Sequence, residues 1–229
     1  MTEKGRPIGF FALWHNKRSE YHASAEERDQ IQAAIARAFR NGQARGITMA
    51  GRYGCRWPAE RQYFTFWICP DLPALEATMD DLEQAGDFKF AHSEHIVGVQ
   101  LPDPEMTDPD MLGCARSGAP PIGFFALWRM TAACRRADPD AWDRLDRRVR
   151  GVFESARGEG VRMLGRYDCR WSSAWDYFTF WQVPGFEKLE AIMDRLEPAG
   201  DFWFAESRHI IGNDEPHFRF GRRLLTERE

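Results

Sequence analysis

An internal repeat constrains this chain more than any other feature. The segment GRYGCRWPAERQYFTFW at residues 51–67 returns as GRYDCRWSSAWDYFTFW at residues 165–181, an offset of 114 residues. The match runs without a gap from Pro7 and Pro121 to Gly98 and Gly212. Roughly 40 of the roughly 92 paired positions are identical, which indicates a tandem duplication. Each copy must therefore fold by the same plan, within the length of one ordinary domain.

Each copy shows the order strand, helix, strand, strand, helix, strand. The apolar run PIGFFALW opens both copies and predicts a buried first strand. Ser24 and Glu27 form a capping-box pattern at the first helix of copy one. Asp138 and Pro139 supply an N-cap and a first-turn proline at the same place in copy two. The five-residue connections PAERQ and SSAWD predict a hairpin between the two middle strands.

The order βαββαβ is the ferredoxin-like plan. We therefore predict an α+β fold of two tandem ferredoxin-like repeats, packed sheet to sheet as an intramolecular α+β barrel, because aromatic strands need cover on both faces. The predicted domains are repeat 1 at 5–100, a Pro/Asp-rich linker at 101–119, repeat 2 at 120–213 and a C-terminal tail at 214–229.

Composition narrows the classes of function. The net charge of −4, with mixed signs, gives no electrostatic case for binding nucleic acid or an anionic membrane. No apolar run approaches the ~18 residues of a membrane span, and the N-terminus lacks a signal-peptide pattern. Five cysteines without CxxC spacing favour reduced thiols in a cytoplasmic protein and predict no metal site. A homo-oligomer remains open.

Strand alternation assigns side chains to the two faces of each predicted sheet. Phe64 and Phe66 are wholly apolar, so we expect them to face the helices. The polar and aromatic residues between them would then face the barrel interior. This interior set comprises Tyr63, Thr65 and Trp67, their repeat partners Tyr177, Thr179 and Trp181, the arginines Arg52, Arg56, Arg166 and Arg170, and the histidines His95 and His209.

Such a set suits an anionic or phenolic aromatic ligand. Arginine offers a planar donor fork for a carboxylate or enolate, histidine can move a proton near neutral pH, and tyrosine and tryptophan provide stacking walls. We expect His209, Tyr177 and His95 to be catalytic, and we expect seven residues to bind substrate: Arg166, Arg170, Trp181, Thr179, Arg52, Tyr63 and Trp67. The alternatives are an arginine ion pair at the rim, hydrogen-bonded core histidines and aromatic residues that only pack.

The FFALW opening, the FW strand end before a Pro-Asp-Leu helix start and the terminal HIVG strand resemble the dimeric α+β barrel superfamily. The resemblance is closest to its darcynin-like and antibiotic-biosynthesis-monooxygenase-like members, here as a tandem fusion. The superfamily includes cofactor-free monooxygenases, muconolactone-type isomerases, haem-degrading oxygenases and chlorite dismutases. The resemblance implies a fold and leaves the reaction open.

Three functions follow as hypotheses. The first is an enzyme without a cofactor that carries out proton transfer, oxygenation or isomerisation on an anionic aromatic or polyketide-like molecule. The second is a haem enzyme of the chlorite dismutase-like type, with His95, His209 or His217 as the axial ligand. The resemblance implies a haem ligand on or near a helix, whereas His95 and His209 fall on predicted strands. The third is a ligand-binding or scaffold protein without catalysis.

Overall fold

The computed structural model describes residues 5–55, 61–102 and 122–214. This part of the chain divides into two compact units, unit 1 up to Val99 and unit 2 from Gln100 to Asp214. Arg56, His217, nearly all of the predicted linker and all but the first residue of the predicted tail lie outside the described residues.

Both units have the predicted α+β, ferredoxin-like fold, so the predicted fold class is confirmed. Unit 1 consists of β1 (Ile8–Asn16), α1 (Arg18–His22), α2 (Ala25–Ala44), β2 (Thr48–Gly54), β3 (Tyr63–Cys69), α3 (Leu72–Ala85), α4 (Asp87–Phe90) and β4 (Ala91–Gln100). Unit 2 consists of β5 (Ile122–Met130), α5 (Ala132–Arg136), α6 (Pro139–Gly158), β6 (Arg162–Asp168), β7 (Tyr177–Val183), α7 (Phe186–Ala199), α8 (Asp201–Phe204) and β8 (Ala205–Asp214). The short helices α1, α4, α5 and α8 were not predicted.

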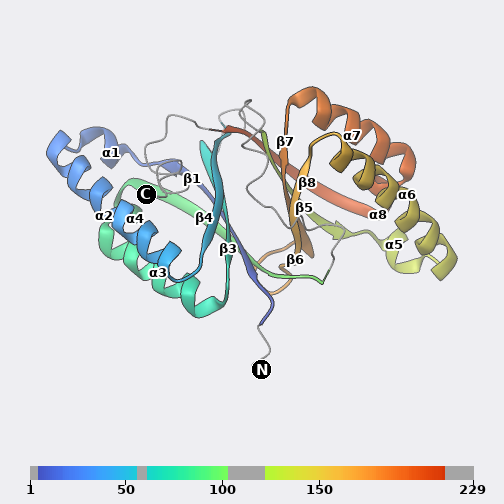
Figure 1. Ribbon diagram of the computed structural model, residues 1–229, viewed down its shortest axis with the longest axis horizontal. Helices are drawn as coiled ribbons and strands as arrows, with labels where there is room; N and C mark the ends of the chain where they lie inside the picture. The colour runs from blue at the N-terminus through green and yellow to red at the C-terminus, as the bar shows by residue number, and fades with distance from the viewer. Residues whose placement is uncertain (1–4, 56–60, 103–121, 215–229) are drawn as a thin grey trace. The chain divides into compact units, whose positions relative to one another are not determined.

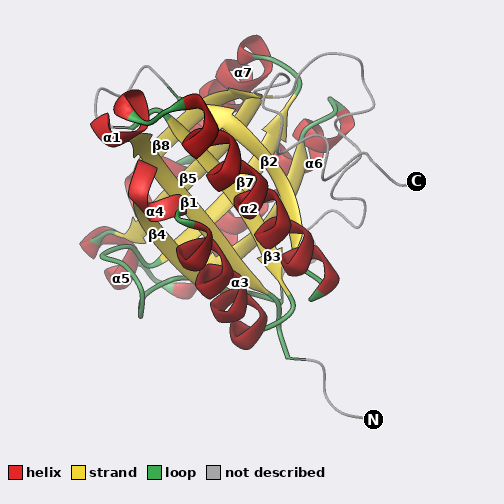
Figure 2. Ribbon diagram, turned by 90° about the vertical axis from the view of Figure 1, so that its left-hand side faces the viewer, coloured by secondary structure: helices red, strands yellow, loops and turns green. Residues whose placement is uncertain are grey.

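Each unit forms an antiparallel sheet in the order β4-β1-β3-β2 or β8-β5-β7-β6. The two long helices of a unit, α2 with α3 and α6 with α7, lie on one side of its sheet (Figure 1). Figure 2 shows α2 and α3 side by side across the strands of unit 1. The sheet and its two helices therefore enclose a layer of side chains in each unit.

The predicted helix starts are present. Ser24 accepts a hydrogen bond from the backbone N–H of Glu27 at 3.1 Å, and Asp138 accepts one from Ala141 at 2.7 Å. The Glu27 carboxylate does not complete the predicted capping box, because it pairs with Lys89 instead. This ion pair joins the start of α2 to α4.

The predicted strand faces were wrong. Thr65 lies opposite Ala12 and Trp67 opposite Phe10 in the β1–β3 ladder, and all four side chains face the helices rather than the other side of the sheet. Phe64 and Phe66 occupy the other face. The error has a physical cause: the helix-covered face is not purely apolar, because it holds a cavity with polar groups.

A β-bulge explains the matching error on the second strand. The pairing of β2 with β3 shifts between Met49 and Gly51, so Met49 and Arg52 face the same side although they are three residues apart. Gly51 has φ of 146°, a conformation that L side chains rarely adopt. Tyr53 stacks on Phe64 on the other face, with ring centroids 5.0 Å apart.

Replacing each of two helical glycines with alanine should change the free energy of unfolding in opposite directions. A Cβ at Gly42 of α2 would come within 2.9 Å of the buried Thr78 of α3, whereas a Cβ at Gly151 of α6 would meet nothing within 4 Å. We expect Gly151→Ala to raise the free energy of unfolding by about 0.5–1 kcal/mol, since alanine favours helix. Gly42→Ala should lower it by about 1–3 kcal/mol through overpacking. Urea unfolding of both variants tests this, and a stabilised Gly42→Ala would contradict the packing described.

Candidate functional site

Unit 1 contains a cavity of about 340 Å³ between its sheet and its helices, here called cavity 1. Its walls are mainly aromatic and aliphatic. The aromatic side chains come from the sheet, α2 and α4: Phe10, Trp14, Phe39, Tyr63, Trp67, Phe88 and Phe90. Five titratable or charged residues also line it: Glu20 of α1, Arg28 of α2, Arg52 of β2, Asp87 of α4 and His95 of β4. An apolar cavity with a few convergent polar groups is typical of a small-molecule site.

Arg52 is held in place by aromatic rings. Its guanidinium carbon lies 4.1 Å from the ring centroid of Tyr63 and 5.1 Å from that of Trp14, distances at which a cation is attracted by the ring face. On the neighbouring strand β3, Thr65 donates a hydrogen bond to the Gly51 carbonyl at 2.7 Å. These contacts place a cation against an aromatic floor, where it can bind an anionic group of a stacked ligand.

His95 lies on the same floor. Its ring centroid is 5.1 Å from that of Phe10 and 6.1 Å from that of Phe88. Burial lowers the pKa of His95 below its ordinary value of 6.5, because the charged imidazolium loses its hydration. The imidazole is therefore neutral near pH 7 and can accept a proton or a metal ion.

Two acidic groups in cavity 1 have raised pKa values. Burial raises the pKa of Asp87 from 3.8 to about 6, against the opposing effect of the Arg52 charge. Burial also raises the pKa of Glu20, against the charges of Arg52 and Arg28. Carboxyl groups that titrate near neutral pH beside a specific cation are common at functional sites. Cavity 1 therefore contains a carboxyl group and an imidazole that can hold or move a proton.

Sequence reasoning missed three of these residues. Asp87 could have been found, because AGDF at 85–88 recurs as AGDF at 199–202 and so repeats a charge beside the helix end. Glu20 and Arg28 carried no such signal. Their repeat positions are Cys134 and Trp142, and α1 was not predicted.

Unit 2 contains a smaller cavity of about 170 Å³ in the corresponding place, here called cavity 2. Arg166, His209, Thr179 and Trp181 all line it. His209 lies 5.0 Å from the Phe124 ring centroid, and although it is exposed, desolvation on its protein side lowers its pKa. The structure thus brings four predicted residues together, on the helix side of the sheet rather than the predicted side.

Tyr177 and Arg170 do not line cavity 2. The Tyr177 ring packs on Trp128, with centroids 4.5 Å apart. Arg170, predicted to face the barrel interior, is exposed just beyond the end of β6. It pairs with Asp168, with its Nε 3.0 Å from Oδ1 and its Nη2 2.5 Å from Oδ2. The rim ion pair that was the alternative interpretation is what the structure shows for this arginine.

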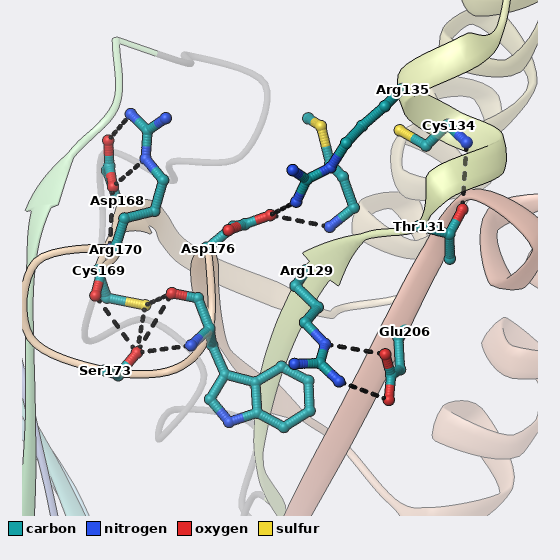
Figure 3. Close-up of polar contacts among 12 residues, drawn as sticks. Arg129, Thr131, Cys134, Arg135, Asp168, Cys169, Arg170, Ser173, Asp176 and Glu206 are labelled. Carbon is teal, nitrogen blue, oxygen red and sulfur yellow. Dashed lines mark hydrogen bonds and ion pairs between the residues drawn. The ribbon is translucent and has the colours of Figure 1, made fainter.

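Polar side chains beside cavity 2 form hydrogen bonds and ion pairs with neighbouring groups of unit 2, as Figure 3 shows. Asp176 accepts a hydrogen bond from the Met130 backbone N–H at 2.9 Å. Arg129 makes two contacts with Glu206, at 2.8 and 3.1 Å. The hydroxyl of Ser173 donates to the Cys169 sulfur at 3.3 Å. These contacts join the strand ends and loops of unit 2, so we assign them a structural role.

The cysteines of the described residues are free and buried: Cys55, Cys69, Cys134 and Cys169. Burial raises the pKa of Cys55 and Cys169 to about 11 and that of Cys69 to about 12. These three thiols therefore stay protonated and unreactive at neutral pH. Among residues 5–55, 61–102 and 122–214, no three His, Cys, Asp or Glu side chains are grouped as metal ligands, and no helix is long and apolar enough to cross a membrane.

Comparisons with known proteins identify the fold. No family model and no curated protein matches the sequence. Among solved structures, a mutant chlorite dismutase from Candidatus Nitrospira defluvii is 14% identical, with a TM-score of 0.76 over 93% of each chain. The same enzyme in complex with imidazole gives a TM-score of 0.74 at 14% identity, again over 93% of each chain. The structure described as "Putative Chlorite dismutase TA0507" gives a TM-score of 0.70 at 10% identity, over 92% of this chain and 95% of its own.

Identities this low show a shared fold and leave the reaction open. The neighbours are chlorite dismutase-like, and the likeness concerns the fold. The closer resemblance to darcynin-like proteins stays a prediction.

The residues of cavity 1 fit haem in kind. They provide a neutral histidine, aromatic walls and two arginines that could pair with propionates. They depart from the expected arrangement in space and in position, since the roughly 340 Å³ of cavity 1 suits a ligand smaller than haem. His95 is on a strand, and the residues of α2, α3, α6 and α7 that line the cavities of the described chain include no histidine.

Proposed function

We propose that cavity 1 is the active site of an enzyme that binds a planar aromatic molecule with an anionic group. One observation carries the proposal: Arg52, held over Tyr63 and Trp14, faces the same aromatic cavity as neutral His95 and the high-pKa acid Asp87. Each group has a distinct task. Arg52 binds and orients the anionic group, the aromatic walls exclude water, and Asp87 and His95 hold or move a proton.

Haem is the first candidate ligand, since it is planar, carries two carboxylates and is suggested by the chlorite dismutase-like fold. The imidazole of His95 would hold the iron, and Arg28 and Arg52 would hold the propionates. When bound, haem would supply the redox chemistry of its iron. Asp87, kept largely protonated below about pH 6 by burial, would offer a proton beside it.

A metal-free aromatic acid or phenol is the second candidate, and the size of cavity 1 favours it. About 340 Å³ lies near the lower end of the roughly 300–1,000 Å³ typical of ligand pockets. A ligand of two fused rings suits that volume. In this case Asp87 and His95 would exchange a proton with the substrate itself, at the carboxyl oxygen and the ring nitrogen, as general acid and base.

Titration with two probes separates the candidates. Haemin and 1-hydroxy-2-naphthoate would be added in turn to the purified protein and to its His95→Gln and His209→Gln variants. A haem site predicts a shifted, saturable Soret band at one equivalent, lost in His95→Gln and kept in His209→Gln. A metal-free site predicts saturable naphthoate binding, followed by tryptophan fluorescence, with no His95-dependent Soret shift. If neither probe saturates, the proposed function is wrong.

A further inference from the structure

Matching residues line the two cavities on the sheet side, whereas the residues on the helix side differ. The sheet of each unit, together with α4 or α8, supplies the same residue types at repeat positions. These pairs are Phe10 and Phe124, Trp67 and Trp181, Arg52 and Arg166, Asp87 and Asp201, and His95 and His209. The first two helices of each unit diverge. Glu20 and Arg28 of unit 1 correspond to Cys134 and Trp142 of unit 2.

In unit 1 this divergence adds one cation, Arg28, and one acid, Glu20. Arg28 Nη1 lies 3.5 Å from the Glu20 backbone oxygen. Arg28 of α2 and Arg52 of β2 both line cavity 1. Burial raises the pKa of the Glu20 carboxyl, against the charges of the two arginines. Two guanidinium groups that line one cavity can pair with the carboxylate of a ligand.

In unit 2 the divergence fills space. The Trp142 ring lies against Phe204, with centroids 6.0 Å apart, and both line cavity 2. Cys134, in the place of Glu20, is buried, and burial raises its pKa, so it contributes an uncharged thiol. Cavity 2 has about 170 Å³ against about 340 Å³ for cavity 1. A flat indole thus stands where unit 1 has a charged side chain.

We propose that Arg28 and Trp142 set the specificity of the two repeats. Arg28 gives cavity 1 its preference for a carboxylate-bearing two-ring ligand, and Trp142 excludes such a ligand from cavity 2. The inference rests on the proposed function, since it concerns the ligand of the same site. It makes the chain a duplicated protein with one site for this ligand class rather than two.

The test compares 1-hydroxy-2-naphthoate with 1-naphthol, which has the same rings without the carboxylate. Calorimetric titration of the full chain should give one equivalent of naphthoate, bound at least tenfold more tightly than naphthol. Arg28→Gln removes the charge and leaves a shorter polar side chain. It should weaken naphthoate about tenfold and naphthol less than threefold. Trp142→Ala and Trp142→Leu should each open cavity 2 to a second equivalent of naphthol, which needs no second cation.

The outcomes separate the two proposals. If the wild-type chain binds one equivalent of naphthoate and Arg28→Gln leaves the preference over naphthol unchanged, the specificity role fails while the proposed function stands. If the wild-type chain already binds two equivalents, Trp142 does not exclude the ligand. If neither Trp142 variant gains a second equivalent while remaining folded, the same conclusion holds. If the wild-type chain binds neither compound, the specificity role fails, and the haemin titration decides whether the proposed function stands.

Discussion

Replacing Asp87 with asparagine is expected to make the protein more stable at pH 7.5. Burial raises the pKa of Asp87 to about 6 in the folded state, from 3.8 when exposed. The folded state therefore binds more protons than the unfolded state between these values, and stability falls as pH rises through that window. At pH 7.5 the ionised carboxylate carries the full cost, on the order of 1–3 kcal/mol at about 1.4 kcal/mol per pKa unit. Asparagine cannot ionise and avoids it.

Urea unfolding of wild type and Asp87→Asn at pH 4.5 and pH 7.5 measures this effect. The variant should gain on the wild type as pH rises, with a smaller difference between the two proteins at pH 4.5, which lies inside this window. Asp81→Asn is the control of opposite sign, since the Arg45 hydrogen bond at 2.7 Å lowers the pKa of Asp81. That variant should lose a little stability at pH 7.5. An Asp87→Asn protein that is less stable than wild type at pH 7.5 would show that Asp87 serves the fold rather than the site.

Replacing Arg52 with methionine should weaken binding of 1-hydroxy-2-naphthoate by a factor on the order of 10 to 100. Methionine keeps much of the length and apolar contact of arginine while removing the charge. A hydrogen bond to a charged group contributes about 1.5–3 kcal/mol, which sets this range. The loss of the cation–π contacts with Tyr63 and Trp14 should cost about 0.5–1 kcal/mol of stability. Affinity should therefore fall far more than stability does.

Arg166→Met is the matched control, since Arg166 holds the same repeat position in cavity 2. It should leave naphthoate affinity within about twofold of wild type if cavity 1 is the site. Calorimetry gives affinity and thermal melting gives stability for both variants. Equal losses of affinity in the two variants would mean that the units bind alike. A large drop in melting temperature with unchanged affinity for Arg52→Met would assign Arg52 to the structure.

The fold could be predicted from the sequence because the two copies show the same order of elements with different residues. Ser24 and Asp138 cap the corresponding helices α2 and α6, and both caps are present. The strand faces could not be read, because alternation assumes an unbroken strand. The bulge between Met49 and Gly51 breaks it. Because the helix-covered face was expected to be purely apolar, the polar residues were assigned to the wrong face of the sheet.

The candidate site was only partly predictable. Arg52, His95, Tyr63, Thr65 and Trp67 were named, and all line one cavity, while their functional roles stay predictions. Glu20 and Arg28 reach it only through the packing of α1 and α2 against the sheet, which alternation along a strand does not predict.

Arg170 shows the converse error. Its position two residues after Asp168 allows a local ion pair, which alternation along a strand could not reveal.

The most direct test of the central claim is the crystal structure of the protein with 1-hydroxy-2-naphthoate bound. We expect the ring system inside cavity 1, against the aromatic floor, with its carboxylate in contact with the Arg52 guanidinium and its edge near Asp87 or His95. Naphthoate bound anywhere outside cavity 1, or inside it with the carboxylate turned away from Arg52, would show that cavity 1 is not the site proposed for this ligand.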